Sequence, residues 1–365
     1  MAYTADFAQE IVTSTRIRLA RNFAAYPFPR KMDEMQAEDI VYLVGEGLKK
    51  FEVENQYLVS KLSARKARLL KQEYLAFTKY KMSDLDPQSA KLLLEQHLIS
   101  PALLKSKSGA AFIYDDEESI SIMVNEEDHL REQYICSGFQ LTKAYERISA
   151  IDDGLGSTYD FAFDDKLGYI TACPSNLGTG MRASVMIFLP ALSMNGELKK
   201  MLPSIRSEGL TVRGAYGEGT SSEGYLYQVS NERTLGLSEQ ELLEKVTRMT
   251  MVLAEKEYDA EAELKRALGT TLKDKCLRAY GVLTNCAVLP FAEFKEKMSE
   301  VRFGATLGFF DMIDKKGFDR LFNDMRPASI RVSNDLLRAS EKKCDESRAE
   351  IVGTVLPEMV LVKRK

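Results

Sequence analysis

The spacing of apolar residues divides the chain into a mixed part and a helical part. Residues 36–51 repeat apolar side chains at the spacing of an amphipathic helix. Residues 110–131 contain two β-rich runs around the acidic turn 115–118, a pattern typical of a β-hairpin. Residues 225–231 alternate apolar and polar side chains, as a half-buried strand does. These patterns predict helices and strands together in the first part of the chain.

The segment 171–190 has an unusual order of residues, with a cysteine, a proline, a glycine-rich turn and then an apolar run. We predict that residues 169–173 form a strand and that the apolar run forms a helix ending near Pro190. Residues 210–216 are a further strand candidate.

A helical part follows. Ser238 and Glu241 have the spacing of a capping box, and the helical apolar pattern after them continues for many turns. Almost everything beyond is helix-like. We therefore predict an α/β (α+β) domain at residues 1–257 and a helical C-terminal domain at residues 258–365.

The charge balance limits the classes of partner. Fifty basic and 54 acidic side chains give a formal net charge of −4. This balance provides no general attraction to nucleic acid or to an anionic membrane, so neither is an expected partner. The first residues do not resemble a signal peptide, and no run approaches the roughly 20 apolar residues of a membrane span. We expect a cytoplasmic protein.

Cysteine and histidine are too scattered for a disulfide framework or a structural zinc site. The five cysteines are widely spaced without a C-x-x-C pair, and the chain has two histidines. A metal ion that takes part is therefore expected to arrive with a substrate.

The motifs that commonly hold nucleotide phosphates are missing. Residues 178–183 fit the pattern G-x-G-x-x-A formally, but Pro174 precedes the turn and no alternating strand–helix series surrounds it. The chain has no Walker A motif and no pair of H-R-D and D-F-G motifs. Arginine is the alternative device, because its planar guanidinium binds phosphate in a bidentate manner.

Five arginines in unusual local sequences are candidates for that role. Arg16 and Arg18 are two apart, so on a strand both side chains project from one face. The other three are Arg131, Arg182 and Arg213. The competing interpretation is that each is an ordinary surface residue.

Carboxylates gather at two places. Residues 126–128 are three consecutive acids, and Glu218 stands between glycines. A solvated turn is the simplest explanation of either group alone. Two carboxylates converging on one site would instead suit a cationic substrate or supply a base.

Four ordered motifs closely resemble those of the ATP:guanido phosphotransferases, the family of creatine and arginine kinases. They are "STRIRLAR", "NEEDHLR", "CPSNLGTGMRASV" and "VRGAYGEGTSSEGYLYQVSNERTLGLSE". The resemblance extends from about Ser14 to Leu243. It implies a catalytic domain with an antiparallel sheet flanked by helices, and ATP as a substrate whose phosphates carry Mg²⁺.

The resemblance also implies a role for each candidate. His97 matches a histidine that lies against the nucleoside, and Cys173 matches a cysteine that contacts the substrate guanidinium. Glu127 and Glu218 match the carboxylates that hold this guanidinium, one of them a candidate base. The arginines that match phosphate ligands are Arg16, Arg18, Arg131, Arg182 and Arg213.

The turn between Cys173 and Arg182 carries two further expectations. Ser175 is expected to hydrogen-bond the Cys173 thiolate and lower its pKa. The turn is expected to bring its backbone N–H groups and Arg182 towards phosphate. A buried inert cysteine is the competing interpretation of Cys173.

Within the family, the chain is most similar to the bacterial protein-arginine kinases of the McsB type. Thirteen residues precede the first motif, where creatine and arginine kinases carry a helical domain, and a helical extension follows the catalytic core. This branch implies arginine-bearing proteins as substrates, marked for ClpC/ClpP degradation, with a McsA-type activator and a homodimer as expected partners. The alternatives are a phosphagen kinase acting on a free guanidino compound and a non-catalytic phosphoarginine-binding regulator.

The C-terminal part departs from the branch at one motif. The branch pattern R-D-x-x-R-A contributes to a phosphoarginine site, and here Asp345, Arg348 and Ala349 match while Cys344 replaces the first arginine. The resemblance implies that Arg348 grips the phosphate and Asp345 the guanidinium. The competing interpretation is a single ion pair between residues three apart on a helix.

Overall fold

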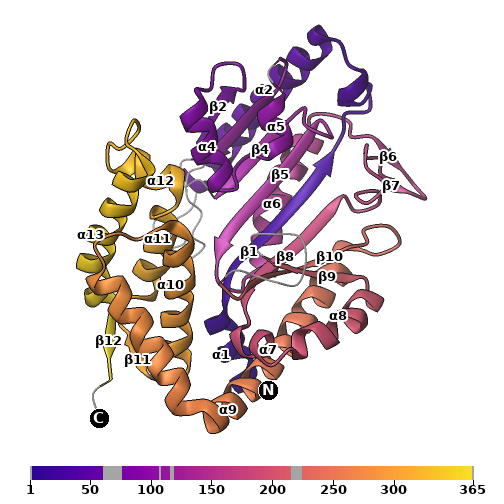
Figure 1. Cartoon of the computed structure of the whole chain (residues 1–365). Helices are drawn as coiled ribbons and strands as arrows, with labels where there is room; N and C mark the ends of the chain where they lie inside the picture. Colours follow the sequence, from indigo (N-terminus) through magenta and orange to yellow (C-terminus); the bar gives the residue numbers. More distant parts are fainter. Residues whose placement is uncertain (1, 61–75, 107, 116–118, 215–223, 364–365) are drawn as a thin grey trace.

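An antiparallel sheet organises the first part of the molecule. The computed structural model describes residues 2–60, 76–106, 108–115, 119–214 and 224–363. Within these residues, eight strands pair in the order β2-β3-β4-β5-β1-β8-β10-β9 (Figure 1). The strands are β1 (Val12–Arg21), β2 (Phe77–Lys81), β3 (Ala111–Asp115), β4 (Ile120–Val124), β5 (Leu130–Ser137), β8 (Met181–Phe188), β9 (Leu210–Gly214) and β10 (Leu226–Asn231).

Helices surround this sheet and continue beyond it. The helices of the first part are α1 (Ala2–Ile11), α2 (Glu34–Ser60), α4 (Pro87–Glu95), α5 (Pro101–Lys105), α6 (Leu141–Gly156), α7 (Pro190–Met194) and α8 (Glu197–Ser207). The later helices are α9 (Glu239–Asn285), α10 (Phe291–Thr306), α11 (Lys315–Asp324), α12 (Pro327–Ser333) and α13 (Glu341–Met359). Short pairs of strands complete the described fold: β6 (Phe163–Asp164) with β7 (Gly168–Tyr169), and β11 (Phe310–Met312) with β12 (Val360–Val362).

Strand β1 has two faces with different chemistry. It lies between β5 and β8, and Arg18 is opposite Gln133 of β5 and Arg182 of β8. Ile17 and Leu19 are buried in the main core together with apolar residues of α6, which packs against β1 and β5. Because side chains alternate along a strand, those of Arg16 and Arg18 lie on the side of the sheet away from α6.

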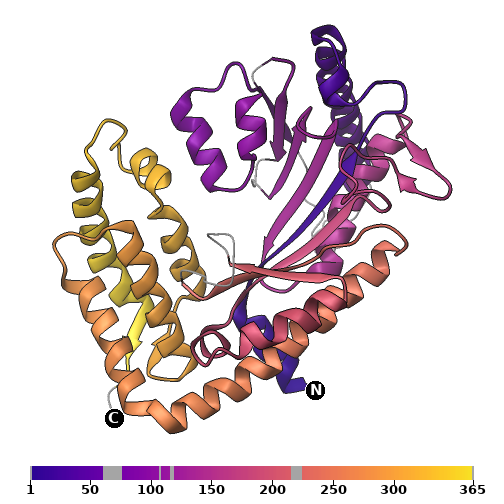
Figure 2. The ribbon, with the colours of Figure 1, turned by 45° about the vertical axis from the view of Figure 1, so that its right-hand side comes forward.

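Helix α9 connects the sheet to the C-terminal helices. It starts at the capping box of Ser238 and Glu241 and continues to Asn285, with non-helical backbone at Leu268. It packs on β8 and β10 near its beginning and on α10 and α13 near its end. Figure 2 shows α9 along the lower edge of the molecule and α12 across from α4, which it contacts. The expected boundary after residue 257 lies inside α9.

The C-terminal helices have a core of their own. Phe294, Phe318 and Val352 are buried in it, together with apolar residues from all of α10 to α13. The predicted order of a mixed α/β part followed by a helical region is therefore confirmed. Among the residues that the structure describes, no helix is long and apolar enough to cross a membrane.

Several local predictions are confirmed and two are wrong. The hairpin at β3 and β4, helix α2, strands β9 and β10 and the capping box all form as predicted. Residues 181–188 form strand β8 rather than a helix, since Ala183, Val185 and Ile187 alternate into the core. Only Tyr169 of the predicted strand 169–173 is in a strand. A short apolar run does not distinguish a helix from a buried strand by periodicity alone.

Candidate functional site

The five candidate arginines gather on the face of the sheet away from α6. Arg18 and Arg182 are direct neighbours across β1 and β8, and Arg131 of β5 is opposite Ala20, two residues along the same face. Arg213 of β9 is opposite Gln228 of β10. The sequence places these arginines on four strands, and the strand register brings them together.

The positive charges lie close enough to affect one another. Loss of surrounding water, followed by the charges of Arg131 and Arg182, lowers the pKa of Arg16 to about 9. Loss of water, followed by Arg213 and Arg131, also lowers the pKa of Arg182. The five guanidinium groups together give this face a concentrated positive charge that favours a polyanion.

Neutral and acidic side chains hold the arginines without neutralising the whole set. Arg131 forms an ion pair with Glu126 at 2.8 Å, and Arg182 donates to Ser230 Oγ at 2.9 Å. Arg16 donates to Gln133 Oε1. Sequence reasoning missed these three partners, because the acidic run alone does not tell Glu126 from Glu127 and the others depend on the register.

Some donor atoms of the arginines have no partner within the part of the chain that the structure describes. The Nε atoms of Arg16, Arg18 and Arg182 are buried and have no hydrogen-bond partner there. A buried cationic donor without an acceptor is costly, whereas phosphate oxygens would satisfy it in a charge-assisted hydrogen bond. The donor set therefore fits a triphosphate.

His97 borders this face from the end of α4. Its backbone has a φ of +63°, and its carbonyl oxygen accepts from Gln133 Nε2 at 2.6 Å. Loss of water, followed by the charges of Arg326 and Arg16, lowers its pKa to about 4. The His97 side chain is exposed on one side, and the protein around the rest of the ring removes part of its water. The imidazole is therefore neutral at pH 7 and suited to lie flat against a nucleoside.

The acidic loop 125–129 is a tight turn that leaves one carboxylate exposed. Asn125 has a φ of +60°, and its N–H donates to His129 O at 2.9 Å. Asp128 is buried and accepts from the backbone N–H of Ala172 at 2.6 Å. Glu127 is exposed. Because Asp128 joins the two loops, Glu127 and Cys173 lie on adjoining segments.

The loop after Cys173 differs in part from expectation. Cys173 is half-buried, and its Sγ lies 3.0 Å from Ser175 Oγ, as expected. The backbone N–H groups of Asn176 to Thr179 donate to carbonyl oxygens of the protein. The prediction that these N–H groups face phosphate is wrong, because carbonyl oxygens of the turn and of Tyr169 and Thr234 accept from them. Gly178 is needed for close packing, since a Cβ there would lie 2.4 Å from Thr234 O.

The remaining candidates for this site are Glu218 and a metal ion. Glu218 lies outside the described residues. Within the part of the chain that the structure describes, no group of three or more His, Cys, Asp and Glu side chains could hold a metal ion.

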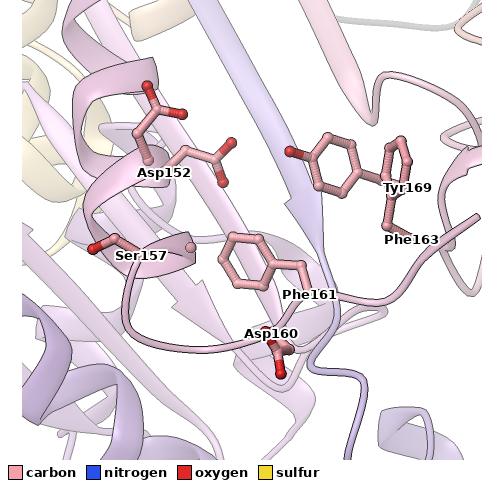
Figure 3. A pocket seen from close by; sticks show the side chains of 8 residues that line it. Asp152, Ser157, Asp160, Phe161, Phe163 and Tyr169 are labelled. Atoms are coloured by element: carbon pink, nitrogen blue, oxygen red, sulfur yellow. The ribbon is translucent and has the colours of Figure 1, made fainter.

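A pocket of about 460 Å³ lies on the opposite, α6 side of the sheet (Figure 3). Asp152 and Asp153 of α6 line it together with Phe161 and Tyr169. The guanidinium carbon of Arg21 stands 3.5 Å from the centre of the Tyr169 ring. None of the residues predicted for the site lines this pocket, which is therefore separate from the arginine face.

Two family models match most of the chain. The model described as "ATP:guanido phosphotransferase, C-terminal catalytic domain" matches residues 59–260. The chain belongs to the ATP:guanido phosphotransferase family. The model described as "Protein-arginine kinase McsB C-terminal domain" matches residues 269–361.

Relatives within the family match at full length. A protein named "Protein-arginine kinase" from Caldanaerobacter subterraneus subsp. tengcongensis is 40% identical over 355 residues, which is 96% of this chain and 98% of the relative. A protein of the same name from Clostridium acetobutylicum is 39% identical, covering 88% and 89%. The solved structure "Crystal Structure of Lombricine Kinase" aligns with a TM-score of 0.56 at 24% identity, covering 70% of this chain and 68% of that one. That likeness shows the fold.

The motif that departs from the bacterial branch lies in the C-terminal core. Arg348 is 1% exposed and donates to Met325 O at 3.0 Å, to Leu289 O at 2.7 Å and to Asp345 at 2.6 Å. The ion pair expected between Asp345 and Arg348 is present. Cys344 is also 1% exposed, so an arginine at that position would have to enter the core. A phosphoarginine site at these residues stays a prediction.

Proposed function

We propose that this chain is a protein-arginine kinase, which transfers the γ-phosphoryl group of ATP to arginine side chains of proteins. The observation that carries the proposal is the arginine face, whose buried Nε atoms lack partners and which adjoins the loops of Glu127 and Cys173. The full-length similarity to proteins named protein-arginine kinase supports the choice of substrate.

The arginine face aligns the nucleotide. Arg16, Arg18, Arg131, Arg182 and Arg213 bind the phosphates, while the neutral imidazole of His97 lies against the nucleoside. The transferring phosphoryl group spreads negative charge over its oxygens, so guanidinium groups held in place by the sheet stabilise the transition state. Mg²⁺ is bound through the ATP phosphates and neutralises part of their charge.

The carboxylates prepare the substrate guanidinium, which is a poor nucleophile because it is protonated and delocalised. Glu127 and Glu218 orient the guanidinium, and one of them accepts its proton as the N–P bond forms. The bond between the γ-phosphorus and the bridging oxygen breaks, and ADP leaves with the bonding electrons. Cys173, hydrogen-bonded to Ser175, contacts the guanidinium from the adjoining loop.

The biological context is part of the same proposal. Phosphorylation of arginine marks proteins for ClpC/ClpP-type degradation, and a McsA-type activator and a homodimer belong to the proposed assembly. A cytoplasmic location is proposed with it, in keeping with the five free cysteines of the structure.

The proposal is tested by incubating the protein with γ-³²P-labelled ATP, Mg²⁺ and either free arginine or an arginine-rich protein. Acid-labile label on the protein and none on free arginine is the expected result. Label on free arginine alone would identify a phosphagen kinase, and no label on either, with phosphoarginine still bound, would identify a non-catalytic regulator. Glu127→Gln is the matched control, since it removes one charge on an exposed loop and is expected to abolish labelling.

A further inference from the structure

One arginine outside the sheet has the features of the arginines in the nucleotide site. Among the described residues, the arginines whose buried Nε has no partner are Arg16, Arg18, Arg182 and Arg326. Three of them are on the sheet face described above. The fourth, Arg326, is the N-cap residue of α12 in the C-terminal helical part. A partnerless, buried cationic donor is costly in the free protein and indicates an anion that completes it.

A two-way contact fixes Arg326 beside the nucleotide site. Glu95 at the end of α4 accepts through its carboxylate from the N–H groups of Ala328 and Ser329, at 2.8 to 3.1 Å. The carbonyl oxygen of Glu95 in turn accepts from Arg326 Nη1. Two residues after Glu95 the chain reaches His97. The backbone of α4 and the start of α12 are thus held together at the edge of the arginine face.

The contacts continue to the sheet. The carbonyl oxygen of His97 accepts from Gln133 Nε2 at 2.6 Å, and Gln133 Oε1 accepts from Arg16. Arg326 and Arg16 both lower the pKa of His97, after the larger effect of lost water, so both positive charges face the same imidazole. His97 therefore lies between an arginine of the sheet and an arginine of the C-terminal part.

We propose that Arg326 is a nucleotide-binding residue, which the C-terminal part contributes to the ATP site beside His97. Its guanidinium donates to a phosphate oxygen of the bound nucleotide while it keeps its hydrogen bond to Glu95 O. The inference rests on the proposed function, because it adds a residue to the same ATP site.

The contact between α4 and α12 brings positive charges close together. It places Arg326 near the concentrated charge of Arg16 and its neighbours. A bound triphosphate neutralises this charge on both sides and favours the contact.

The test is isothermal titration of the full chain with ATP and Mg²⁺. Arg326→Gln keeps an N–H donor for Glu95 O but removes the charge, and ATP should bind roughly 10- to 100-fold more weakly. Arg326→Lys keeps the charge without the guanidinium and should lose less affinity. Arg331→Ala is the matched control on α12, because Arg331 donates to Ala339 O at 2.7 Å and to Glu341 and should leave ATP affinity unchanged.

Each outcome of the titration supports or overturns the role of Arg326 in nucleotide binding. Wild-type affinity in Arg326→Gln overturns the inference and leaves the proposed function standing, and so does an equal loss in Arg331→Ala, which would assign the effect to a loosened α12. If the wild-type chain does not bind ATP, the proposed function fails and the inference with it. Should Arg326→Gln fail to fold, Arg326→Lys must still bind ATP more weakly than the wild type, and equal binding overturns the inference.

Discussion

The two faces of strand β1 use the same residue type in opposite ways. Arg21, on the α6 side, is 2% exposed and pairs with Asp152 through Nε and Nη2 at 2.7 to 3.0 Å. Its Nη1 donates to the carbonyl oxygens of Ala20 and Thr179. Arg16 and Arg18, on the other side, have buried Nε atoms without a partner among the described residues. We call an arginine saturated when its donor atoms are hydrogen-bonded within the protein, and such an arginine stabilises the fold. We call a buried arginine unsaturated when a donor atom has no partner among the described residues, and that atom is available to donate to a ligand.

The C-terminal core extends the comparison. Arg348 is hydrogen-bonded through Nε and Nη1, with two backbone carbonyls and Asp345 as acceptors. Arg326 is unsaturated like Arg16. We therefore propose that the hydrogen-bond pairing of an arginine distinguishes a structural role from a ligand-binding role in this molecule more clearly than its place in a motif does.

The largest expected effect is on catalysis when an unsaturated arginine is removed. Arg18→Ala should lower kcat/KM for ATP by about 10³-fold, since the contact strengthens as charge develops on the phosphoryl oxygens. The unfolding free energy should not fall, because the change removes a buried, repelled charge. Steady-state kinetics and urea unfolding measure the two quantities, and a destabilised but fully active variant would reverse the comparison.

The second effect is on stability when a saturated arginine is removed. Arg21→Ala should lower the unfolding free energy by about 3–5 kcal/mol, because Asp152 is left buried without its partner. The double variant Arg21→Ala/Asp152→Ala should lose less than the sum of the single changes. Urea unfolding decides, and a loss below about 1 kcal/mol in the single variant would show that Arg21 is not structural.

Buried carboxylates give the third effect, on pH dependence. Burial, partly offset by hydrogen bonds from Leu192 and Ala191, raises the pKa of Glu257 to about 8, and burial raises that of Glu261 to about 7. The folded state then holds protons that the unfolded state releases near pH 4.5. Rising pH should therefore lower the unfolding free energy between about pH 4.5 and 8, by an amount on the order of 2–5 kcal/mol.

The control for this pH dependence is Glu257→Gln, which has no proton to lose and should flatten the slope. Urea unfolding at pH 5, 6.5 and 8 measures it. A wild-type stability that rises over this range would show that the buried carboxylates are ionised in the folded protein.

The smallest effect concerns a single thiol. Burial raises the pKa of Cys136 and of Cys276 to about 11, and Cys344 is 1% exposed. Cys173 is half-buried beside Ser175, so iodoacetamide should label it first, and bound substrates should slow the labelling. Peptide mass spectrometry after timed quenching measures the order, and equal labelling of all five cysteines would contradict it.

Part of the site follows from sequence periodicity, and part depends on strand register. The spacing of Arg16 and Arg18 is enough to place both on one face of a strand. Their neighbours Gln133 and Ser230 are not predictable, because each becomes a partner only through pairing across strands that are distant in sequence. The order of a mixed part and a helical part can be predicted from the patterns along the chain. Strand β8 cannot be distinguished from a helix in the same way, because its apolar run is short.

The C-terminal residues show a second limit. Arg348 has the motif spacing of a ligand-binding residue, but its burial and its backbone acceptors depend on how α13 packs on distant segments. Arg326 does not belong to any of the motifs found in the sequence. Its position beside His97 follows from the contact of α12 with Glu95, more than 200 residues earlier in the chain.

The most direct test compares the melting temperatures of the wild type and Arg18→Ala with and without ATP and Mg²⁺. We expect Arg18→Ala to melt no lower than the wild type without ligand, and ATP to raise the melting temperature of the wild type alone. An Arg18→Ala variant that melts lower on its own and is still stabilised by ATP as strongly as the wild type would contradict the assignment of the unsaturated arginines to the nucleotide.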